Sequence, residues 1–312
     1  MANWRSSASL HALQARASLY AVIRQFFSER NVLEVDTPAL AQHGVTDLHI
    51  DCIEVPNYGY LQSSPEFHMK RLLAAGSGPI YQIGKAFRDG ERGTKHNPEF
   101  TMLEWYRPGF SLQDLIDECI VLLRQCLSIN QTAQYHFREL FFNVVGLDPL
   151  SSDIASLRQA ALAYDSHLPE LEKPALIDWF MSCVVEPALP QHCINIVTDF
   201  PEWAAALAKK RTDARGDIVA ERFEIYVNGI ELANGYLELT DAQEQASRFA
   251  NDNALRQQQN KKHMTPDQAL INALKHGLPH CSGVAIGLDR VLLVQQQAQS
   301  LADIIAFPHD RA

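Results

Sequence analysis

Cationic side chains are crowded into the segment FRDGERGTKHNPEF, which contains Arg88, Arg92, Lys95 and His96. A guanidinium offers a planar fork of donors, and its charge-assisted hydrogen bonds to phosphate are stronger than neutral ones. Phe100 closes the segment, and an aromatic ring beside an arginine can sandwich a flat nucleobase. The segment therefore predicts a nucleotide phosphate site, although by itself it also fits a solvated charged turn.

Two acids, Glu231 and Glu238, lie on either side of Asn234 and Gly235 in the segment ELANGYLE. Positions seven apart on a flat strand face opposite sides, and a bulge at Gly235 would bring both carboxylates to one pocket. Paired acids among apolar residues suit Mg²⁺, an ammonium group, or both. The alternative is a hairpin with two exposed acids.

The third candidate is GVAIGLDR, in which Gly283 and Gly287 precede Asp289 and Arg290. Glycine lets a backbone approach a ligand closely. Arg290 opens a helix, where the positive end of the helix dipole and a guanidinium both attract a phosphate. An ordinary buried strand followed by a helix capped by Asp289 is the structural alternative.

The elements that would position these residues follow from the hydrophobic pattern. Helical spacing predicts helices over 10–30, 111–127, 241–260 and 289–298, and one that begins at SSPE, 63–66. Strand patterns predict a hairpin over 79–88 and 97–106, and a second over 221–240 around Asn228-Gly229. NVLEVDTPAL is a β-rich run that ends at its proline. This order indicates an α+β domain with a mainly antiparallel sheet flanked by helices.

Length and composition narrow the class of protein. The 312 residues are 46% hydrophobic, carry a formal charge of −10 and include no long apolar run free of charges. The six cysteines show no CxxC pairing and no secretion signal is present, so a cytoplasmic protein with reduced thiols is expected. The acidic balance disfavours adhesion to nucleic acid, so a small molecule or a protein segment is a better partner than tRNA.

Together, these segments resemble the three signature motifs of class II aminoacyl-tRNA synthetases. NVLEVDTP is similar to motif 1, FRDGERGTKHNPEFTMLEWY to motif 2 and GVAIGLDR to motif 3. Within that class SPEFHMKRLL, HNPEFTMLEWY and GIELANGYLEL resemble lysyl-tRNA synthetase most. The likeness extends over roughly residues 10–310. It implies a single class II synthetase-like catalytic domain over 1–312, with a helical insertion or flank around 148–215.

Three departures from lysyl-tRNA synthetase are informative. The chain has no room for an anticodon-binding domain, Gly90 stands where motif 2 has glutamate, and Ala285 stands where motif 3 has glycine. They resemble the truncated paralogues, the elongation factor P–lysine ligases. That family activates (R)-β-lysine with ATP and transfers it to a lysine side chain of elongation factor P. A small synthetase acting on tRNA, another amide ligase and a non-enzymatic module remain alternatives.

The resemblance implies specific roles. Arg88 and Arg290 would be catalytic and clamp the ATP phosphates, and Mg²⁺ would lie at Glu231, with Glu238 as a possible second ligand. The other implied ATP contacts are Asp89, Gly90, Asn97, Phe100, Glu231, Leu232 and Gly287. The implied contacts to β-lysine or lysine are Ser64, Pro65, Glu66, Tyr106, Asn234, Glu238 and Ala285. Elongation factor P is the implied acceptor, and motif 1 implies a homodimer.

Overall fold

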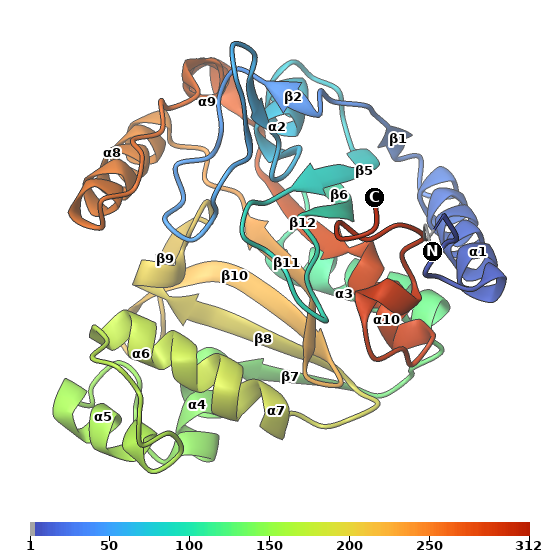
Figure 1. Cartoon of the computed structure of the whole chain (residues 1–312). Coiled ribbons are helices and arrows are strands. Elements are labelled where there is room, and N and C mark those ends of the chain that lie inside the picture. Colours follow the sequence, from blue (N-terminus) through green and yellow to red (C-terminus); the bar gives the residue numbers. More distant parts are fainter. Residues whose placement is uncertain (1–3) are drawn as a thin grey trace. The chain divides into compact units, whose positions relative to one another are not determined.

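The computed structural model describes residues 4–312, and the chain divides into two compact units (Figure 1). Unit 1 comprises Met1–Ser128 and Leu237–Ala312, and unit 2 comprises Ile129–Tyr236. Most of the predicted site residues belong to unit 1. The prediction of a single catalytic domain over the whole chain stays a prediction.

The sheet of unit 1 contains β1 (Leu33–Glu34), β5 (Ile80–Phe87), β6 (Glu99–Pro108) and β12 (Cys281–Gly287), in that order. β1 is parallel to β5, whereas β5–β6 and β6–β12 are antiparallel. The predicted hairpin is thus confirmed, and so is the α+β class. Only two residues of NVLEVDTPAL join this sheet. A small second sheet contains β2 (Leu40–Ala41), β4 (Gly59–Leu61) and β3 (Glu54–Val55).

The helices of unit 1 form two groups. α1 (Leu10–Ser28), α3 (Leu112–Leu127) and α10 (Leu288–Gln295) pack together, and so do α2 (Glu66–Ala74), α8 (Ala242–Gln258) and α9 (Gln268–Gly277). A short 3-10 turn, η3 (Leu301–Asp303), follows α10. The side chains of Ser9 and Ser111 cap α1 and α3 by accepting backbone N–H bonds. The predicted helices are confirmed, whereas α9, capped by Asp267, was not predicted.

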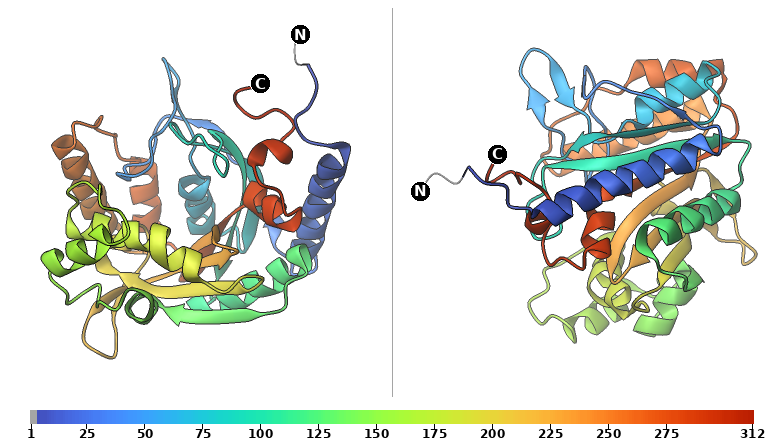
Figure 2. Two further views of the ribbon diagram at one scale, coloured as in Figure 1. Left: turned by 60° about the horizontal axis from the view of Figure 1, so that its bottom comes forward. Right: turned by 90° about the vertical axis from the view of Figure 1, so that its right-hand side faces the viewer.

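The two faces of β6 have different surroundings. Trp105 is fully buried on one face, where its ring lies 5.3 Å from that of Phe27 and its Nε1 donates to Glu118 at 3.0 Å. Figure 2 shows α1, which carries Phe27, lying lengthwise beside β5 and β6. Successive side chains on a strand point to opposite faces, so Glu104 and Tyr106 lie on the face away from α1. That second face carries the candidate site.

Unit 2 has its own set of strands and its own apolar core. Its strands are β7 (Thr132–His136), β8 (Ile194–Pro201), β10 (Ile218–Val227) and β11 (Ile230–Leu237), with β9 (Lys210–Thr212) paired to β10. β7–β8 is parallel, and β8–β10 and β10–β11 are antiparallel. Asn228 and Gly229 both have positive φ, as the turn of a two-residue hairpin requires, so this predicted hairpin is confirmed.

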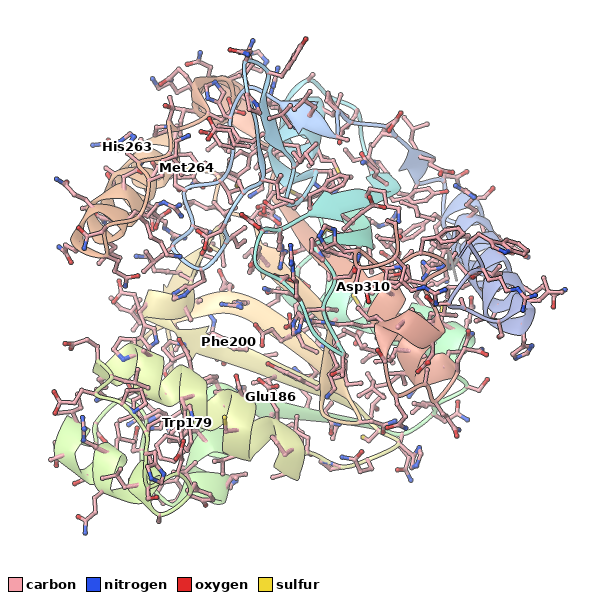
Figure 3. The ribbon with its side chains drawn as sticks, viewed as in Figure 1. Trp179, Glu186, Phe200, His263, Met264 and Asp310 are labelled. Carbon is pink, nitrogen blue, oxygen red and sulfur yellow. The ribbon has the colours of Figure 1, made fainter. Side chains whose placement is uncertain are left out.

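The helical part of unit 2 consists of short segments. They are α4 (Phe137–Val145), α5 (Ile154–Leu162), α6 (Lys173–Phe180), the π-helical turn η1 (Met181–Val185), α7 (Glu186–Ala188) and the 3-10 turn η2 (Glu202–Ala204). Trp179 and Phe200, labelled in Figure 3, belong to the apolar core that these helices share with β8 and β10. The region 148–215 is therefore not wholly helical, because it also contains β8 and β9. A short apolar run such as INIV does not reveal by periodicity whether it is strand or helix.

Candidate functional site

A largely buried cluster in unit 1 brings three glutamates and one lysine together. Lys70 on α2 forms ion pairs with Glu66 at 2.7 Å and with Glu238 at 2.6 Å. Glu104 on β6 is the third acid, and the residues Lys70, Glu104 and Glu238 are each at most 2% exposed. Buried charges are expensive unless they are paired, so such a cluster indicates a function for the acids. We call Glu66, Lys70, Glu104 and Glu238 the acid pocket.

Neutral donors hold Glu104 in place. The Tyr106 hydroxyl donates to Glu104 Oε1 at 2.7 Å, and the Ser64 hydroxyl donates to Glu104 Oε2 at 3.1 Å. Ser64 Oγ also accepts the backbone N–H of Glu66 at 3.0 Å, at the start of α2, while Pro65 is the buried residue that precedes the helix. Within residues 4–312 no cationic side chain forms an ion pair with Glu104. Glu104 is thus the acid of this cluster whose hydrogen bonds come from neutral donors alone.

Small residues of β12 form the floor of this site. Gly283, Ala285 and Gly287 pair with Tyr106, Glu104 and Met102 of β6, and directly paired residues share a face of the sheet. A Cβ atom at Gly283 would lie 2.3 Å from Tyr106 Cε1 and 2.5 Å from Glu238 Oε1. Position 283 therefore requires glycine, because the pocket side chains fill the space above it. The Ala285 methyl lies at the position directly opposite Glu104.

Burial and neighbouring charges shift the pKa values of Lys70, Glu104 and Glu238. Burial raises the pKa of Glu104 to about 8; the Glu66 charge adds to this rise, while the Tyr106 and Ser64 bonds oppose it. Burial likewise raises the pKa of Glu238 to about 7, against the opposing charge of Lys70. Burial alone would lower the pKa of Lys70, but Glu238 and Glu66 raise it well above its ordinary value. Lys70 is thus a permanent cation, whereas Glu104 and Glu238 exchange protons near neutral pH.

The predicted phosphate ligands lie at the loop between β5 and β6 and at the start of α10. The Arg88 guanidinium is 5.2 Å from the centre of the Phe100 ring and 3.5 Å from the Glu91 carboxylate. Arg290 lies 2.8 Å from Nε2 of His96, which belongs to the same loop as Arg88. Both predicted catalytic arginines therefore lie at the mouth of one hairpin, as a clamp on one phosphate chain requires.

Asp289 anchors the start of α10 to the sheet. Its carboxylate accepts the backbone N–H of Thr101 on β6 at 2.6 Å and pairs with Arg16 of α1 at 2.5 Å. Asp289 is 3% exposed, so this is a buried link between three elements. It fixes the helix end that carries Arg290 beside the strand that carries Phe100. Gly287, which immediately precedes α10, leaves ordinary van der Waals space above its Cα.

The loop itself explains the departure from motif 2. Gly90 has a φ of +75°, a region that L side chains adopt only with strain, and its N–H bonds to the Asp89 carboxylate at 2.8 Å. Asn97 is buried and both of its polar atoms are engaged. Nδ2 donates to the Glu99 carbonyl at 2.6 Å, and Oδ1 accepts from the His309 N–H at 3.0 Å. Here Asn97 holds the loop, and its contact to ATP stays a prediction.

Glu231, Leu232 and Asn234 lie on β11 in unit 2. The strand does have a bulge, but at Leu232 and not at Gly235, because Ala233 pairs with Ile225 and Glu231 with Tyr226, whereas Gly235 pairs regularly with Phe223. The predicted bulge position was therefore wrong. Glycine favours a bulge but does not force one, and the strand pairing at Gly235 is regular. Asn234 accepts a hydrogen bond from Arg222 at 3.1 Å. That Glu231 and Glu238 share one pocket stays a prediction.

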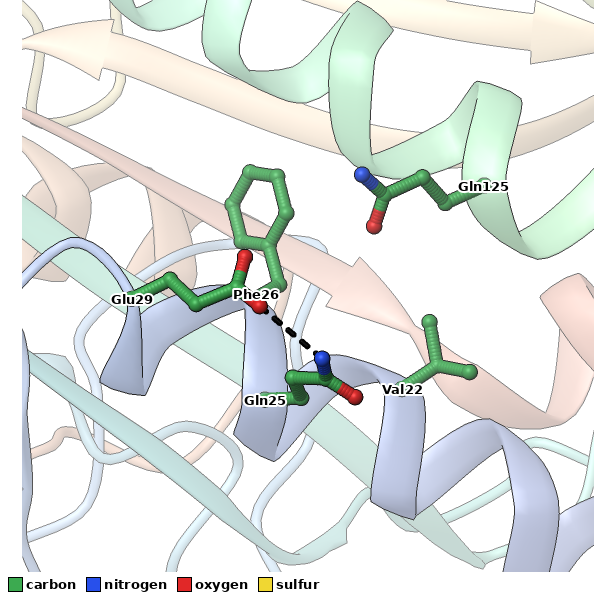
Figure 4. Close-up of a pocket in the computed structure, with 5 residues that line it drawn as sticks. All are labelled: Val22, Gln25, Phe26, Glu29 and Gln125. Atoms are coloured by element: carbon green, nitrogen blue, oxygen red, sulfur yellow. Dashed lines mark hydrogen bonds between the residues drawn. The ribbon is translucent and has the colours of Figure 1, made fainter.

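Elsewhere the chain offers weaker candidates. Residues 4–312 contain no group of three or more histidines, cysteines or acids arranged to hold a metal ion by themselves. A hollow of about 370 Å³ in unit 1 lies beside α1 and α3 and is lined by Val22, Gln25, Phe26, Glu29 and Gln125 (Figure 4). None of the predicted site residues lines it. None of the helices within residues 4–312 combines the length and apolar character needed to cross a membrane.

Two pocket residues, Lys70 and Glu104, were absent from the sequence prediction. Lys70 stands one helical turn after Glu66, at the spacing that brings side chains together on a helix. Glu104 stands two residues before Tyr106 and therefore shares its strand face. A charged residue within a strand of buried side chains is the signal that marks such a position.

The chain is similar throughout to proteins of known family. The family profile described as tRNA synthetases class II (D, K and N) matches residues 1–311. An elongation factor P–(R)-β-lysine ligase of Yersinia enterocolitica is 45% identical, with 100% of this chain and 99% of the relative covered. Proteins of the same name from Yersinia pestis and Yersinia pseudotuberculosis are 44% identical, with 98% of each chain covered. These matches confirm the resemblance inferred from the motifs. The chain therefore belongs to the class II tRNA synthetases and, among them, to the family of elongation factor P–(R)-β-lysine ligases.

Proposed function

We propose that this chain activates (R)-β-lysine with ATP as an aminoacyl-adenylate and transfers it to a lysine side chain of elongation factor P. The acid pocket carries the proposal, because its buried carboxylates suit a substrate with ammonium groups. Phe100 and the arginines at the mouth of the hairpin supply the nucleotide side. The names of the relatives support the choice of β-lysine and of elongation factor P as acceptor.

The chemistry needs orientation and charge stabilisation more than covalent help from the protein. A carboxylate oxygen of the amino acid attacks the α-phosphorus of ATP, the bond to the β-phosphate oxygen breaks, and pyrophosphate leaves. Arg88 and Arg290 stabilise the negative charge on the phosphate chain. The acceptor amine, as the free base, then attacks the carbonyl carbon, its proton passes to solvent, and AMP leaves with the electron pair of the mixed anhydride.

We assign Glu231 as a ligand of Mg²⁺. Mg²⁺ keeps several waters and usually binds one or two carboxylates together with substrate phosphates, so it needs no site made wholly of protein ligands. Glu231 is half-buried on β11. Glu238 is a poorer choice for the metal, because its carboxylate lies 2.6 Å from the Lys70 ammonium. Bound Mg²⁺ would neutralise charge on the phosphates, and we assign Glu238 to the amino acid.

The substrate assignment has a direct test. ATP–pyrophosphate exchange is measured with both enantiomers of β-lysine, α-lysine and aspartate. We expect (R)-β-lysine to support the fastest exchange, and a preference for aspartate would overturn the assignment. Transfer to elongation factor P and to lysine tRNA, each with labelled amino acid, then separates a protein-modifying ligase from a small synthetase that acts on tRNA.

The proposal includes a cytoplasmic homodimer formed through the motif 1 region. Leu33 of β1 is 57% exposed in the single chain, as an apolar residue at a dimer contact would be. Light scattering coupled to size exclusion measures the mass in solution. A mass of one chain at micromolar concentration would contradict this part of the proposal without affecting the chemistry.

A further inference from the structure

Lys70 is built into the acid pocket as a cation without access to solvent. Its side chain is 1% exposed, and its ammonium contacts Glu66 at 2.7 Å and Glu238 at 2.6 Å. Removing such a partner leaves the buried carboxylate of Glu238 and the partly exposed carboxylate of Glu66 uncompensated, which is more destabilising than losing a surface ion pair. The lysine also joins α2, which carries Glu66, to the segment after β11, which carries Glu238. It therefore controls both the charge and the spacing of two acids.

The charge of the pocket can be counted from its members. Glu66, Glu104 and Glu238 bring three carboxylates and Lys70 one ammonium, so the fully ionised pocket has a net charge of minus two. The other titratable groups that face it stay neutral. Burial and the neighbouring acids raise the pKa of Tyr106 far above its ordinary value, and burial raises that of Cys281 to about 12. A lysine-like amino acid carries two ammonium groups and would balance this charge.

We propose that Lys70 is a positioning residue that sets the acid pocket to a net charge of minus two, so that an amino acid with two ammonium groups binds in exchange for protons. This inference rests on the proposed function. It assigns Glu104 to one ammonium group, because Glu104 has only neutral donors around it. Glu66 and Glu238 together with Lys70 carry one net negative charge, which is then available to the second ammonium group of the substrate. Lys70 itself touches no substrate atom in this assignment.

Loss of the Lys70 charge has a defined consequence. Glu66 and Glu238 would repel each other in a low-dielectric site, and the pKa of Glu238 would rise further as it retained its proton. Binding of the dication would then require the release of more protons at a given pH. The KM for the amino acid should rise, and the pH at which binding is half-maximal should move upward. The nucleotide side is separate, so the KM for ATP and kcat should change little.

The test compares Lys70→Met and Lys70→Ala with the unaltered chain in ATP–pyrophosphate exchange between pH 6 and 9. We expect the KM for β-lysine at pH 7 to rise about 30-fold, as loss of about 2 kcal/mol for a buried charged partner implies. The KM for ATP should stay within about twofold. Propylammonium should restore Lys70→Ala by filling the vacated volume with a cation, and propanol, which lacks the charge, should not. Lys85→Met is the matched control, because Lys85 is paired to Glu99 on the surface with its side chain 51% exposed.

The outcomes separate the two proposals. If the unaltered chain exchanges pyrophosphate with no diamino acid, the proposed function fails. If it exchanges normally but Lys70→Met keeps its KM and pH profile, only the role of Lys70 fails. A parallel rise in both KM values with a fall in kcat would show a merely structural role and also overturn the inference. If neither variant folds, the proposal is tested on the unaltered chain by calorimetry of β-lysine binding in buffers of different ionisation enthalpy. We expect binding to release protons at pH 7. Binding without proton release would contradict the proposal.

Discussion

Phe100 and Glu104 lie four residues apart on the same face of β6, about 13 Å along the strand, but their surroundings differ. Glu104 itself is 2% exposed, and both of its carboxylate oxygens accept hydrogen bonds from neighbouring hydroxyls. Around Phe100 the cationic groups are partly exposed, and the Arg88 side chain keeps 28% of its surface accessible. We call Arg88, Phe100 and Arg290 the arginine side of unit 1. The acid pocket and the arginine side are therefore two different kinds of site for a charged ligand.

The difference reflects the charge and solvation of the two ligands. An amino acid must lose most of its water to be distinguished from its isomers, so its counter-charges are fixed in a desolvated pocket before it arrives. A triphosphate carries several negative charges and binds tightly to guanidinium groups that remain accessible. The acid pocket should thus govern selection, and the arginine side should govern rate.

The largest effect is expected from Arg88→Ala. Loss of the guanidinium should lower the rate of pyrophosphate exchange about 10³-fold, because a preorganised charge acts mainly on the transition state. Equilibrium binding of β-lysine without ATP, measured by calorimetry, should be unchanged. Arg92→Ala in the same loop is the control, and an equal loss in both variants would remove the distinction between the clamp and general loop charge.

Glu104→Gln should have the next largest effect and act on the other region. The amide keeps the shape but loses the charge, so the KM for the amino acid should rise about 100-fold, as loss of a buried charged contact of about 3 kcal/mol implies. The KM for ATP should stay close to its original value. Glu99→Gln on the exposed part of the same strand is the control. A selective rise in the KM for ATP would reverse the roles of the two regions.

The stability of the ligand-free chain should depend on pH through the acid pocket. An unfolded glutamate loses its proton near pH 4.5, whereas folded Glu104 keeps it up to about pH 8. The folded state therefore binds more protons between these values, and its stability falls as the pH rises through that window. Thermal unfolding should show a Tm that decreases from pH 5 to 8, with a smaller decrease in Glu104→Gln. A Tm that rises over this range in both proteins would contradict the pKa assignment.

The smallest effect is expected at the floor of the pocket. Ala285→Gly removes one methyl opposite Glu104, and a methyl in such a pocket is worth about 1–3 kcal/mol of discrimination. The preference for the best isomer of lysine over the next should therefore fall roughly tenfold, without loss of the maximal exchange rate. Rates with α-lysine and β-lysine, measured side by side, check this. An unchanged ratio would show that the floor does not contact the substrate carbon chain.

Much of unit 1 could be predicted from the sequence because its signals are local. The hairpin of β5 and β6, helices α1 and α3 and the turn from β12 into α10 follow from short-range patterns and caps. Arg88 and Arg290 were predicted as phosphate ligands from similarly short motifs, and that role stays a prediction. The short apolar strand β8 and helix α9 were missed, since neither has a pattern that separates strand from helix or from a connecting segment.

By itself the sequence determined the family and most of the elements of unit 1, and it predicted the residues of the site. Only the tertiary structure decided that Lys70 and Glu104 belong to the acid pocket, and that the bulge of β11 lies at Leu232. These features depend on contacts between segments as distant as α2 and Glu238, where the burial of one charge sets the protonation of another. The spacing of residues along the chain does not reveal this burial, because desolvation and charge pairing arise only when the segments pack together.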